Sequence, residues 1–202
     1  MTALVAITQR VDIVPGRNER RDSLDQRWYP FLAACGVTGV PLPNHPATAL
    51  ALVAALAPGA LVLSGGNDLS ALGGDSPERD ATEDALLAWA RGRGVPVLGV
   101  CRGLQFLAHR FGAELVRVDD HVGTPHPVAG PGARRTVNSF HTWAVRTAPP
   151  GFASLAQAED GTIEMMRHRQ EPITAVMWHP EREAAAVAED VALVRRMMGR
   201  DA

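Results

Sequence analysis

The apolar positions in the first half of the chain form short continuous runs that alternate with segments of helical spacing. Runs of strand length cover residues 4–8, 37–42, 60–63 and 95–100. Apolar side chains three and four positions apart predict helices at residues 18–35, 48–56, 82–91 and 102–111. Strands that alternate with helices indicate βαβ units, and therefore an α/β fold with an open, mostly parallel sheet and helices on both faces.

After Gly112 the pattern changes to short extended pieces that are separated by turns. These pieces are expected at residues 114–118, 135–138, 162–167 and 173–178, and a final helix at 183–198. The Gly- and Pro-rich stretch 121–132 is interpreted as a surface loop. Because we find no repeat, low-complexity tract or linker, we expect residues 1–202 to form one domain with a β-rich C-terminal extension.

A cysteine stands where one apolar run meets a predicted helix. Residues 97–103 read VLGVCRG, so that a strand ends in Gly-x-Cys-x-Gly and a helix begins at once. This pattern is typical of a nucleophile elbow, a strained turn that exposes Cys101, and side chains at Gly99 and Gly103 would collide with neighbouring elements. The helix N-terminus favours a thiolate. The alternative is a structural cysteine buried in tight packing.

A histidine and a glutamate follow the last apolar run. Residues 176–182 read VMWHPER. We expect His179 to act as a base for Cys101, and Glu181 to orient the imidazole, which together make a catalytic triad. A single histidine is more often structural, but this one follows a strand in a chain that already contains a cysteine elbow.

A glycine pair follows the strand at 60–63. Residues 63–68 read LSGGND, and glycines allow backbone amides to turn into a site. The amides of Gly66 and Arg102 are expected to form an oxyanion hole. A simple turn is the alternative. All three motifs lie at the C-terminal ends of predicted strands, where open α/β sheets place their sites.

The motifs together resemble those of class I glutamine amidotransferase-like hydrolases. The matching segments are SGGND (64–68), GVCRGLQ (99–105), VNSFH (137–141), DGTIE (160–164) and WHPE (178–181). Within that group, Arg102 after the cysteine and the VNSFH and DGTIE segments are similar to the γ-glutamyl-γ-aminobutyrate hydrolase family. The resemblance spans nearly the whole chain in the same order.

This resemblance implies a flavodoxin-like sheet and hydrolysis of a γ-glutamyl amide through a γ-glutamyl thioester, without a metal or organic cofactor. L-Glutamate and an amine or amidate are released from a small-molecule substrate. The resemblance makes Cys101 the nucleophile, His179 the base and Glu181 its orienting partner. It implies that the substrate-binding residues include Gly65, Gln105, Asn138, Ser139, Phe140 and His141, although a structural role for His141 is equally compatible with the sequence.

The chain lacks a longer insertion that some members carry before the VNSFH segment. Its start, at residues 7–11 and 19–28, is similar to a compact subgroup represented by γ-glutamyl-CDP-amidate hydrolases. A leaving group of that kind carries phosphate, and guanidinium groups bind phosphate well. Arg79 has a simpler interpretation too, as part of a cap with Asp80 and Glu83 for a helix that begins near Thr82. The candidate leaving-group contacts are Arg10, Arg20, Arg21 and Arg79.

Two further histidines and a second cysteine have structural interpretations. Neither His121 nor His126 belongs to a His-x-x-x-His or Cys-x-x-Cys pattern, so we expect no metal site and assign both to loop ordering or a pocket wall. Cys35 precedes Gly36 at a predicted helix end and is interpreted as a small buried apolar residue.

The composition limits the partners and the location. The 22 acidic residues nearly balance the 20 basic ones, which are all arginine, so no basic excess supports nucleic-acid binding. The absence of lysine is interpreted as a compositional bias. We also find no apolar run long enough to cross a membrane and no signal peptide. With two unpaired cysteines, these features predict a cytoplasmic protein, and they leave its oligomeric state open.

Two other functions are compatible with the same residues. One is a glutaminase subunit that passes ammonia to a synthase partner. The other is a catalytically silent binding module on the same fold, which the intact Cys101, His179 and Glu181 argue against.

Overall fold

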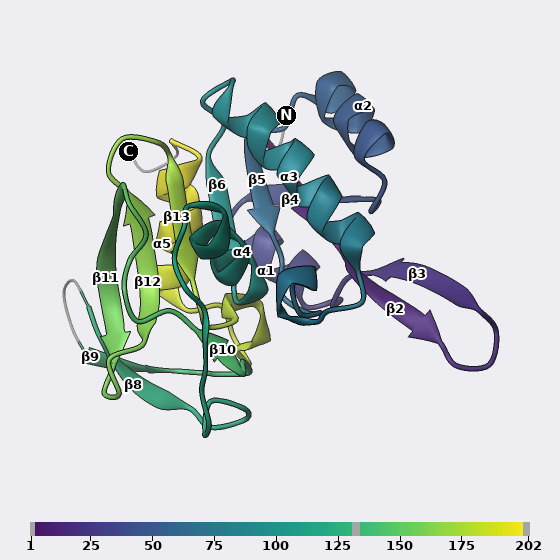
Figure 1. The fold of residues 1–202 in the computed structure, drawn as a ribbon. Helices are drawn as coiled ribbons and strands as arrows, with labels where there is room; N and C mark the ends of the chain where they lie inside the picture. Colours follow the sequence, from purple (N-terminus) through teal and green to yellow (C-terminus); the bar gives the residue numbers. More distant parts are fainter. Residues whose placement is uncertain (1–2, 131–133, 200–202) are drawn as a thin grey trace.

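The centre of the protein is a nine-stranded sheet that takes strands from both halves of the chain. The computed structural model describes residues 3–130 and 134–199. The strand order across the sheet is β4-β1-β5-β6-β13-β12-β11-β8-β9. Figure 1 shows helices packed on both sides of this sheet, with a separate hairpin that projects from one end of the molecule.

Five neighbouring strands are parallel and correspond to apolar runs of the sequence. They are β1 (Ala3–Thr8), β4 (Val37–Leu42), β5 (Ala60–Leu63), β6 (Val97–Val100) and β13 (Ile173–Val176). Strands β5, β6 and β13 are buried along their whole length, as is usual for parallel strands that are covered on both faces. The predicted parallel sheet is therefore confirmed.

The helices cover both faces of the sheet, as predicted. They are α1 (Trp28–Ala34), α2 (Pro46–Leu56), α3 (Pro77–Arg91), α4 (Arg102–Arg110) and α5 (Ala188–Met197). Side chains of β5 alternate between the two faces. Leu61 and Leu63 pack in a core cluster with residues of α2, α3 and α4, whereas Ala60 and Val62 pack with residues of α1 and α5. Figure 1 shows this two-sided arrangement.

The second half of the sheet is antiparallel and forms the predicted β-rich extension. It consists of β12 (Ile163–His168), β11 (Phe152–Ala158), β8 (His126–Ala129) and β9 (Arg134–Val137). A separate two-stranded ribbon pairs β7 (Val116–Arg117) with β10 (Trp143–Ala144). The extended pieces predicted at residues 114–118, 135–138, 162–167 and 173–178 each overlap one observed strand, namely β7, β9, β12 and β13.

The sequence analysis missed three of these strands, β8, β10 and β11. The interpretation of 121–132 as a loop is wrong for His126–Ala129, which forms β8 between β9 and β11; residues 131 and 132 lie outside the described residues. Strand β8 contains Pro127, which local rules disfavour in a strand. Strand β11, FASLAQA, is rich in small and polar residues and has a weak strand pattern. Hydrogen bonding to the neighbouring strands β12 and β8, rather than the strand propensity of its own residues, stabilises β11.

The helix predicted at 18–35 is wrong for its first ten residues. Strands β2 (Arg10–Val14) and β3 (Glu19–Ser23) form an antiparallel hairpin, and α1 begins only at Trp28. The hairpin turn contains Gly16 and Asn18, both with positive φ angles of 73° and 48°, which end any helical continuation. Apolar residues of helical spacing therefore predicted the helix correctly only from Trp28 onward.

Two helices begin at residues other than those predicted. Helix α3 starts at Pro77 rather than near Thr82, and the Thr82 hydroxyl donates to the carbonyl of Glu78 inside the helix. Proline favours the first turn of a helix because its missing N–H is not needed there. Residues 180–182 form a 3₁₀ turn, so α5 begins at Ala188. In the part of the chain that the structure describes, every helix is too short or too polar to span a bilayer.

Candidate active site

Cys101 occupies a strained turn between β6 and α4, as the nucleophile-elbow pattern predicted. Its backbone angles are φ 52° and ψ −104°, a region that residues with a side chain rarely adopt. The turn is packed so tightly that a Cβ at Gly99 would lie 2.7 Å from the Gly103 carbonyl, and a Cβ at Gly103 would lie 2.1 Å from the carbonyl oxygen of Leu63. Both glycines are therefore required for this strand to pass directly into the helix.

The sheet brings His179 next to Cys101 from the other end of the chain. Strands β6 and β13 are parallel neighbours, with Val100 opposite Val176. The amide of Cys101 donates to the carbonyl of Val176 at 2.8 Å. Because Cys101 and His179 follow these two residues by one and three positions, the turns that carry them leave the same edge of the sheet.

The imidazole of His179 is buried and interacts with the Cys101 thiol and the Glu181 carboxylate. Its Nδ1 is 2.7 Å from Glu181 Oε1. Burial alone would disfavour the protonated ring, but the Cys101 thiol and the Glu181 carboxylate outweigh it and raise the pKa of His179 to about 9. At neutral pH these interactions therefore favour the protonated imidazole.

Asn138 holds the backbone of His179 from the opposite side. Its side-chain oxygen accepts from the His179 amide at 2.9 Å, and its side-chain nitrogen donates to the His179 carbonyl at 2.9 Å. The same nitrogen donates to Glu183 Oε1 at 2.6 Å. The sequence analysis expected Asn138 to bind substrate, but the structure uses its amide to fix the position of His179.

The loop after β5 lies against the histidine ring. A Cβ at Gly65 would lie 2.5 Å from His179 Cε1, so only glycine leaves room for the imidazole. Gly66 has φ +86°, which glycine adopts readily. The loop contributes Ser64, Gly65 and Gly66 to the wall of a cavity of about 250 Å³ that also contains His179.

Arg79 determines the direction of the peptide groups in this loop. Its guanidinium donates to three successive carbonyl oxygens, at 2.6 Å for Ser64, at 3.2 Å for Gly65, and in a close contact with Gly66. The carbonyl and the N–H of a trans peptide point in opposite directions. The amides of the next residues, including Gly66, therefore point away from Arg79.

The Arg79 guanidinium belongs to a buried ion network behind the loop. Glu83 accepts from Arg79 Nε at 3.0 Å and from the Thr8 hydroxyl at 2.8 Å, and it also pairs with the side chain of Arg102. Burial opposes the charge of Glu83, but Arg102 and Arg79 outweigh it and lower the pKa of Glu83. Burial and the nearby Arg102 lower the pKa of Arg79 to about 10, so the guanidinium stays protonated at neutral pH.

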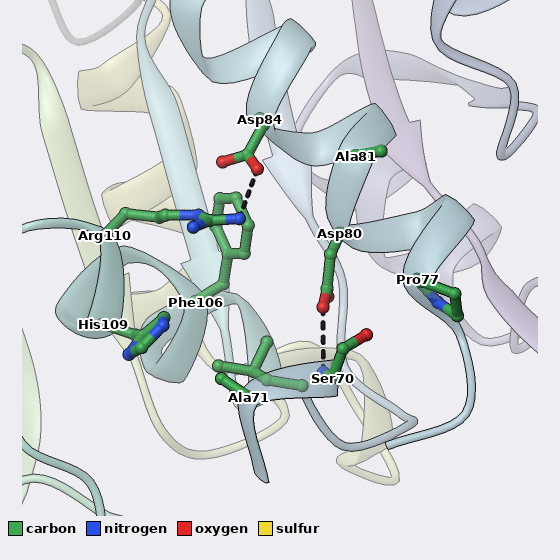
Figure 2. A pocket seen from close by; sticks show the side chains of 10 residues that line it. Ser70, Ala71, Pro77, Asp80, Ala81, Asp84, Phe106, His109 and Arg110 are labelled. Atoms are coloured by element: carbon green, nitrogen blue, oxygen red, sulfur yellow. Dashed lines mark hydrogen bonds and ion pairs between the residues drawn. The ribbon is translucent and has the colours of Figure 1, made fainter. Parts of the chain in front are cut away.

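This network corrects the expected roles of Arg79, Asp80 and Glu83. Asp80 links the Arg102 side chain to the amide of Ser70, from which it accepts at 2.9 Å. Figure 2 shows Asp80 directed at Ser70 in a second cavity, of about 330 Å³, between α3 and α4. These three residues do not cap a helix near Thr82, and Arg79 is too deeply buried to contact a leaving group.

The other arginines predicted to contact a leaving group lie in different places. Arg10 lines the cavity beside His179 and is paired with Asp12 at 2.7 Å. Arg20 donates to Glu78 and to the carbonyl of Asp75, so it connects the hairpin to α3. Arg21 pairs with Glu19 on the exposed hairpin surface.

The cavity has one arginine that the sequence analysis did not select. Arg182 lines it, and its guanidinium stacks on the Phe140 ring at 4.7 Å. Arg182 directly follows the WHPE segment, and this position is the feature of the sequence that could have identified it. Asp25 also lines the cavity, 3.9 Å from Arg182 Nε. Arg27 and Arg182 beside it lower the pKa of Asp25 to about 2, against a smaller effect of burial.

The sequence matches the family profile described as glutamine amidotransferase class-I over residues 23–192. The chain belongs to the class I glutamine amidotransferase family. A glutamine amidotransferase from Thermotoga maritima has the same fold, with a TM-score of 0.70 at 14% sequence identity over 99% of this chain and 85% of that one. The flavodoxin-like arrangement expected from the resemblance agrees with this fold.

Two curated relatives are named for different functions. Gamma-glutamyl-CDP-amidate hydrolase of Campylobacter jejuni is 37% identical over 126 residues, which cover 61% of this chain and 62% of that protein. A glutamine-hydrolyzing GMP synthase subunit of Thermococcus kodakarensis is 31% identical over 164 residues, which cover 77% of this chain and 82% of that protein. The match to the Campylobacter hydrolase thus spans less than two thirds of its length.

The remaining substrate-binding candidates lie on α4 and in the 138–141 segment. Gln105 is buried on α4 and donates to the carbonyl of Trp143 at 2.9 Å. Phe140 is exposed, and its ring packs edge-on against His179 with centroids 5.8 Å apart. Ser139 is buried and donates to the carbonyl of His121 at 2.6 Å.

His141 belongs to a buried cluster that the sequence analysis missed. Its Nε2 lies 3.3 Å from His121 Nδ1 and 3.4 Å from Glu164 Oε1. His126 Nε2 lies 3.5 Å from the same glutamate oxygen. The four side chains come from separate segments, so a test based on short ligand spacing could not detect them.

Proposed function

We propose that this chain is a cysteine hydrolase that cleaves a γ-glutamyl amide and releases L-glutamate. The observation that carries the proposal is the elbow that holds Cys101 beside the buried His179–Glu181 pair. Membership of the class I glutamine amidotransferase family supports a reaction at a γ-glutamyl carbonyl.

In the first step, the Cys101 thiolate attacks the γ-carbonyl carbon and forms a tetrahedral oxyanion. The amides of Gly66 and Arg102 donate to this oxygen. The direction of the Gly66 amide, away from Arg79, supports that role. Protonated His179 then gives its proton to the leaving nitrogen, the C–N bond breaks, and a γ-glutamyl thioester remains on Cys101.

In the second step, water attacks the thioester carbon. His179, now neutral, accepts a proton from this water, and Glu181 stabilises the resulting imidazolium through Nδ1. The C–S bond breaks, and L-glutamate leaves with the oxygen of the water. The cycle restores the thiolate–imidazolium pair and requires no redox partner.

The glutamyl part of the substrate is assigned to residues close to the elbow. Gln105 follows Cys101 by one helical turn, and Ser139, Phe140 and His141 belong to the segment that packs against His179. The peptide groups around Ser139 and Phe140, with Gly65 and the Gln105 side chain, would hold the α-amino and α-carboxylate groups.

The leaving group is assigned to the cavity beside His179. Arg10 and Arg182 line this cavity and are the arginines placed to contact a phosphate-bearing amidate. A γ-glutamyl-CDP-amidate-like nucleotide is the favoured substrate because the Campylobacter relative is named for that activity. γ-Glutamyl-γ-aminobutyrate is the other substrate to compare.

A glutaminase subunit that supplies ammonia to a synthase partner is the second candidate. The observation in its favour is the GMP synthase subunit of Thermococcus kodakarensis, of which 82% is covered by the match. The two candidates share the thioester chemistry and differ in the leaving group and in the need for a partner protein.

Glutamate release from a panel of substrates tests these proposals. The panel contains γ-glutamyl-CDP-amidate, γ-glutamyl-γ-aminobutyrate, γ-glutamyl-p-nitroanilide and free glutamine. We expect the isolated chain to hydrolyse a substituted amide faster than glutamine, and a Cys101→Ala variant to be inactive. Activity confined to glutamine, low until a synthase is added, would support the glutaminase candidate. Unchanged release by Cys101→Ala would contradict both.

A further inference from the structure

A cluster of three histidines and a glutamate includes His141 of the 138–141 segment, and Ser139 of the same segment donates to the carbonyl of His121. His121, His141 and Glu164 are buried, and their ligand atoms lie within 4.8 Å of one another. His126 borders them through its contact with Glu164. We propose that His121, His141 and Glu164 bind one Zn²⁺ ion, with the neighbouring His126 as the fourth ligand, in a site separate from the cysteine chemistry.

Three of the distances within the cluster are those found between the ligands of a tetrahedral metal site, and His126 lies outside the group of ligand atoms that are all within 4.8 Å of one another. The three measured separations between ligand atoms are 3.3 Å for His121–His141, 3.4 Å for His141–Glu164 and 3.5 Å for His126–Glu164. Ligands at about 2.0–2.1 Å from a tetrahedral Zn²⁺ ion are about 3.3–3.4 Å apart.

In His121 and His141, the ring nitrogen that is not directed into the cluster has a hydrogen-bond acceptor. Metal-bound histidines usually donate their second ring N–H to such an acceptor. His121 Nε2 lies 3.3 Å from Asp160 Oδ2, and His141 Nδ1 lies 3.1 Å from the carbonyl of Trp143. Such acceptors hold the ring proton on the outer side and direct a lone pair inward. With the ring protons on the outer side, the inward nitrogens of His121 and His141, which are 3.3 Å apart, would both present a lone pair to a cation.

The inner polar atoms lack partners among the described residues. Both carboxylate oxygens of Glu164 and Nε2 of His126 are buried without a hydrogen bond. Glu164 Oε1 has only the long contacts to His126 and His141, and Oε2 has no hydrogen-bond partner within the described part of the chain, whereas buried charges are normally well paired or coordinate a metal. A divalent cation between the four groups would satisfy these atoms together with the inward lone pairs of His121 and His141.

The ligand chemistry selects the ion. Three imidazole nitrogens and one carboxylate oxygen suit Zn²⁺, whereas Mg²⁺ and Ca²⁺ prefer sets of oxygen ligands. His121, His141 and Glu164 are buried, and His126 as a fourth ligand would leave no open position for substrate, as is typical of structural zinc sites. The ion would therefore stabilise the fold here and take no part in the hydrolysis.

The cluster connects segments that form one wall of the active site. The His141 amide and the Ser139 hydroxyl both donate to the carbonyl of His121, at 3.1 and 2.6 Å. The carbonyl of Glu164 accepts from the amide of Met177, two residues before His179, at 2.8 Å. A bound ion would hold the 138–141 segment, β12 and the end of β13 in fixed positions.

The test measures Zn²⁺ binding in a Cys101→Ala background, which removes the thiolate as a competing zinc ligand. Protein freed of metal with a chelator is titrated with Zn²⁺ against a chromophoric chelator. We expect one equivalent to bind and to raise Tm. Glu164→Gln and His121→Gln should each weaken binding at least tenfold. His109→Gln, a change on α4 outside the cluster, should bind like its parent.

Circular dichroism reports whether each variant folds. Should Glu164→Gln and His121→Gln not fold, Asp160→Asn replaces them, because it weakens an outer partner without removing a ligand and should still lower the Zn²⁺ affinity. Substitution with Co²⁺ should give the strong visible absorption of a tetrahedral site. Absence of a bound equivalent in the Cys101→Ala protein would overturn the proposal, as would folded cluster variants that bind Zn²⁺ as tightly as His109→Gln. Because none of these measurements uses catalysis, they are independent of the proposed hydrolase activity.

Discussion

Gly65 lies directly against the imidazole of His179, so that a Cβ at this position would stand 2.5 Å from His179 Cε1. The contact connects the loop that supplies the proposed oxyanion hole to the proposed base. Neither group can move without the other, because Arg79 holds the loop from behind and Asn138 holds the histidine backbone.

The first prediction concerns this contact. Gly65→Ala should lower kcat/KM at least tenfold, which corresponds to about 1.4 kcal/mol of lost transition-state stabilisation, because the added methyl group displaces His179. Gly92→Ala is the control, since a Cβ there meets only ordinary contacts, the nearest at 3.4 Å. Steady-state kinetics of both folded variants give the comparison. Equal activity of the two would show that the close packing at Gly65 is unimportant for catalysis.

The second prediction concerns pH. The folded-state pKa of His179, about 9, is above its ordinary value of 6.5. The ring therefore carries the proton for the leaving nitrogen at neutral pH and loses it as the pH rises through about 9. We expect kcat/KM to fall above that pH. The stability contributed by protonated His179 is fully present below pH 6.5 and is lost over the same rise.

Removing the cysteine gives a direct check on the cause of this shift. Cys101→Ala should lower the pKa of His179, because the interaction with Cys101 raises it. Cys35→Ala should leave it unchanged, since Cys35 is buried at the end of α1, where burial raises the pKa of its own thiol to about 11. Titration of the His179 ring by NMR measures both. An unaltered His179 pKa in Cys101→Ala would contradict the thiolate–imidazolium pair.

The third prediction concerns the buried ion network. Arg79→Met should destabilise the protein by about 3–5 kcal/mol, because it leaves Glu83 with one fewer cation and three carbonyls without a donor. Arg21→Met, which removes an exposed pair with Glu19, should cost less than about 1 kcal/mol. Urea unfolding gives both values. Similar stabilities for the two variants would show that the Arg79 network contributes little.

The fourth prediction separates two roles for Asn138. If its amide positions His179, Asn138→Ala should lower kcat and leave KM nearly unchanged, because the glutamyl group binds elsewhere. Steady-state kinetics with a γ-glutamyl amide make the measurement. A rise in KM at constant kcat would instead support the substrate contact that the family resemblance implies.

The features of the site that depend on neighbouring residues in the sequence could be predicted. The contacts between residues far apart in the sequence could not. Gly99 and Gly103 at fixed spacing around Cys101 predict the elbow because the packing that requires them is local. Arg79 and Glu83, four residues apart on α3, look like an ordinary surface pair. Only the packing of α3 behind the loop after β5 shows that both are buried.

The histidine cluster illustrates the same limit. His121, His126, His141 and Glu164 approach one another only after β8 pairs with β9 and β11, and β12 joins β11 and β13. Strand β8 has a proline and was interpreted as loop, so its pairing could not be anticipated. The hairpin β2–β3, whose Arg10 reaches the cavity, was hidden by the helical spacing of Leu24, Trp28 and Phe31.

The most direct test of the account is detection of the γ-glutamyl thioester. The protein is mixed with γ-glutamyl-p-nitroanilide, quenched with acid during turnover, and digested for peptide mass spectrometry. We predict one glutamyl group on the peptide that contains Cys101, in the wild type and in Cys35→Ala, and neither the adduct nor glutamate release in Cys101→Ala. Glutamate release by a folded Cys101→Ala variant at the wild-type rate would contradict the proposed mechanism.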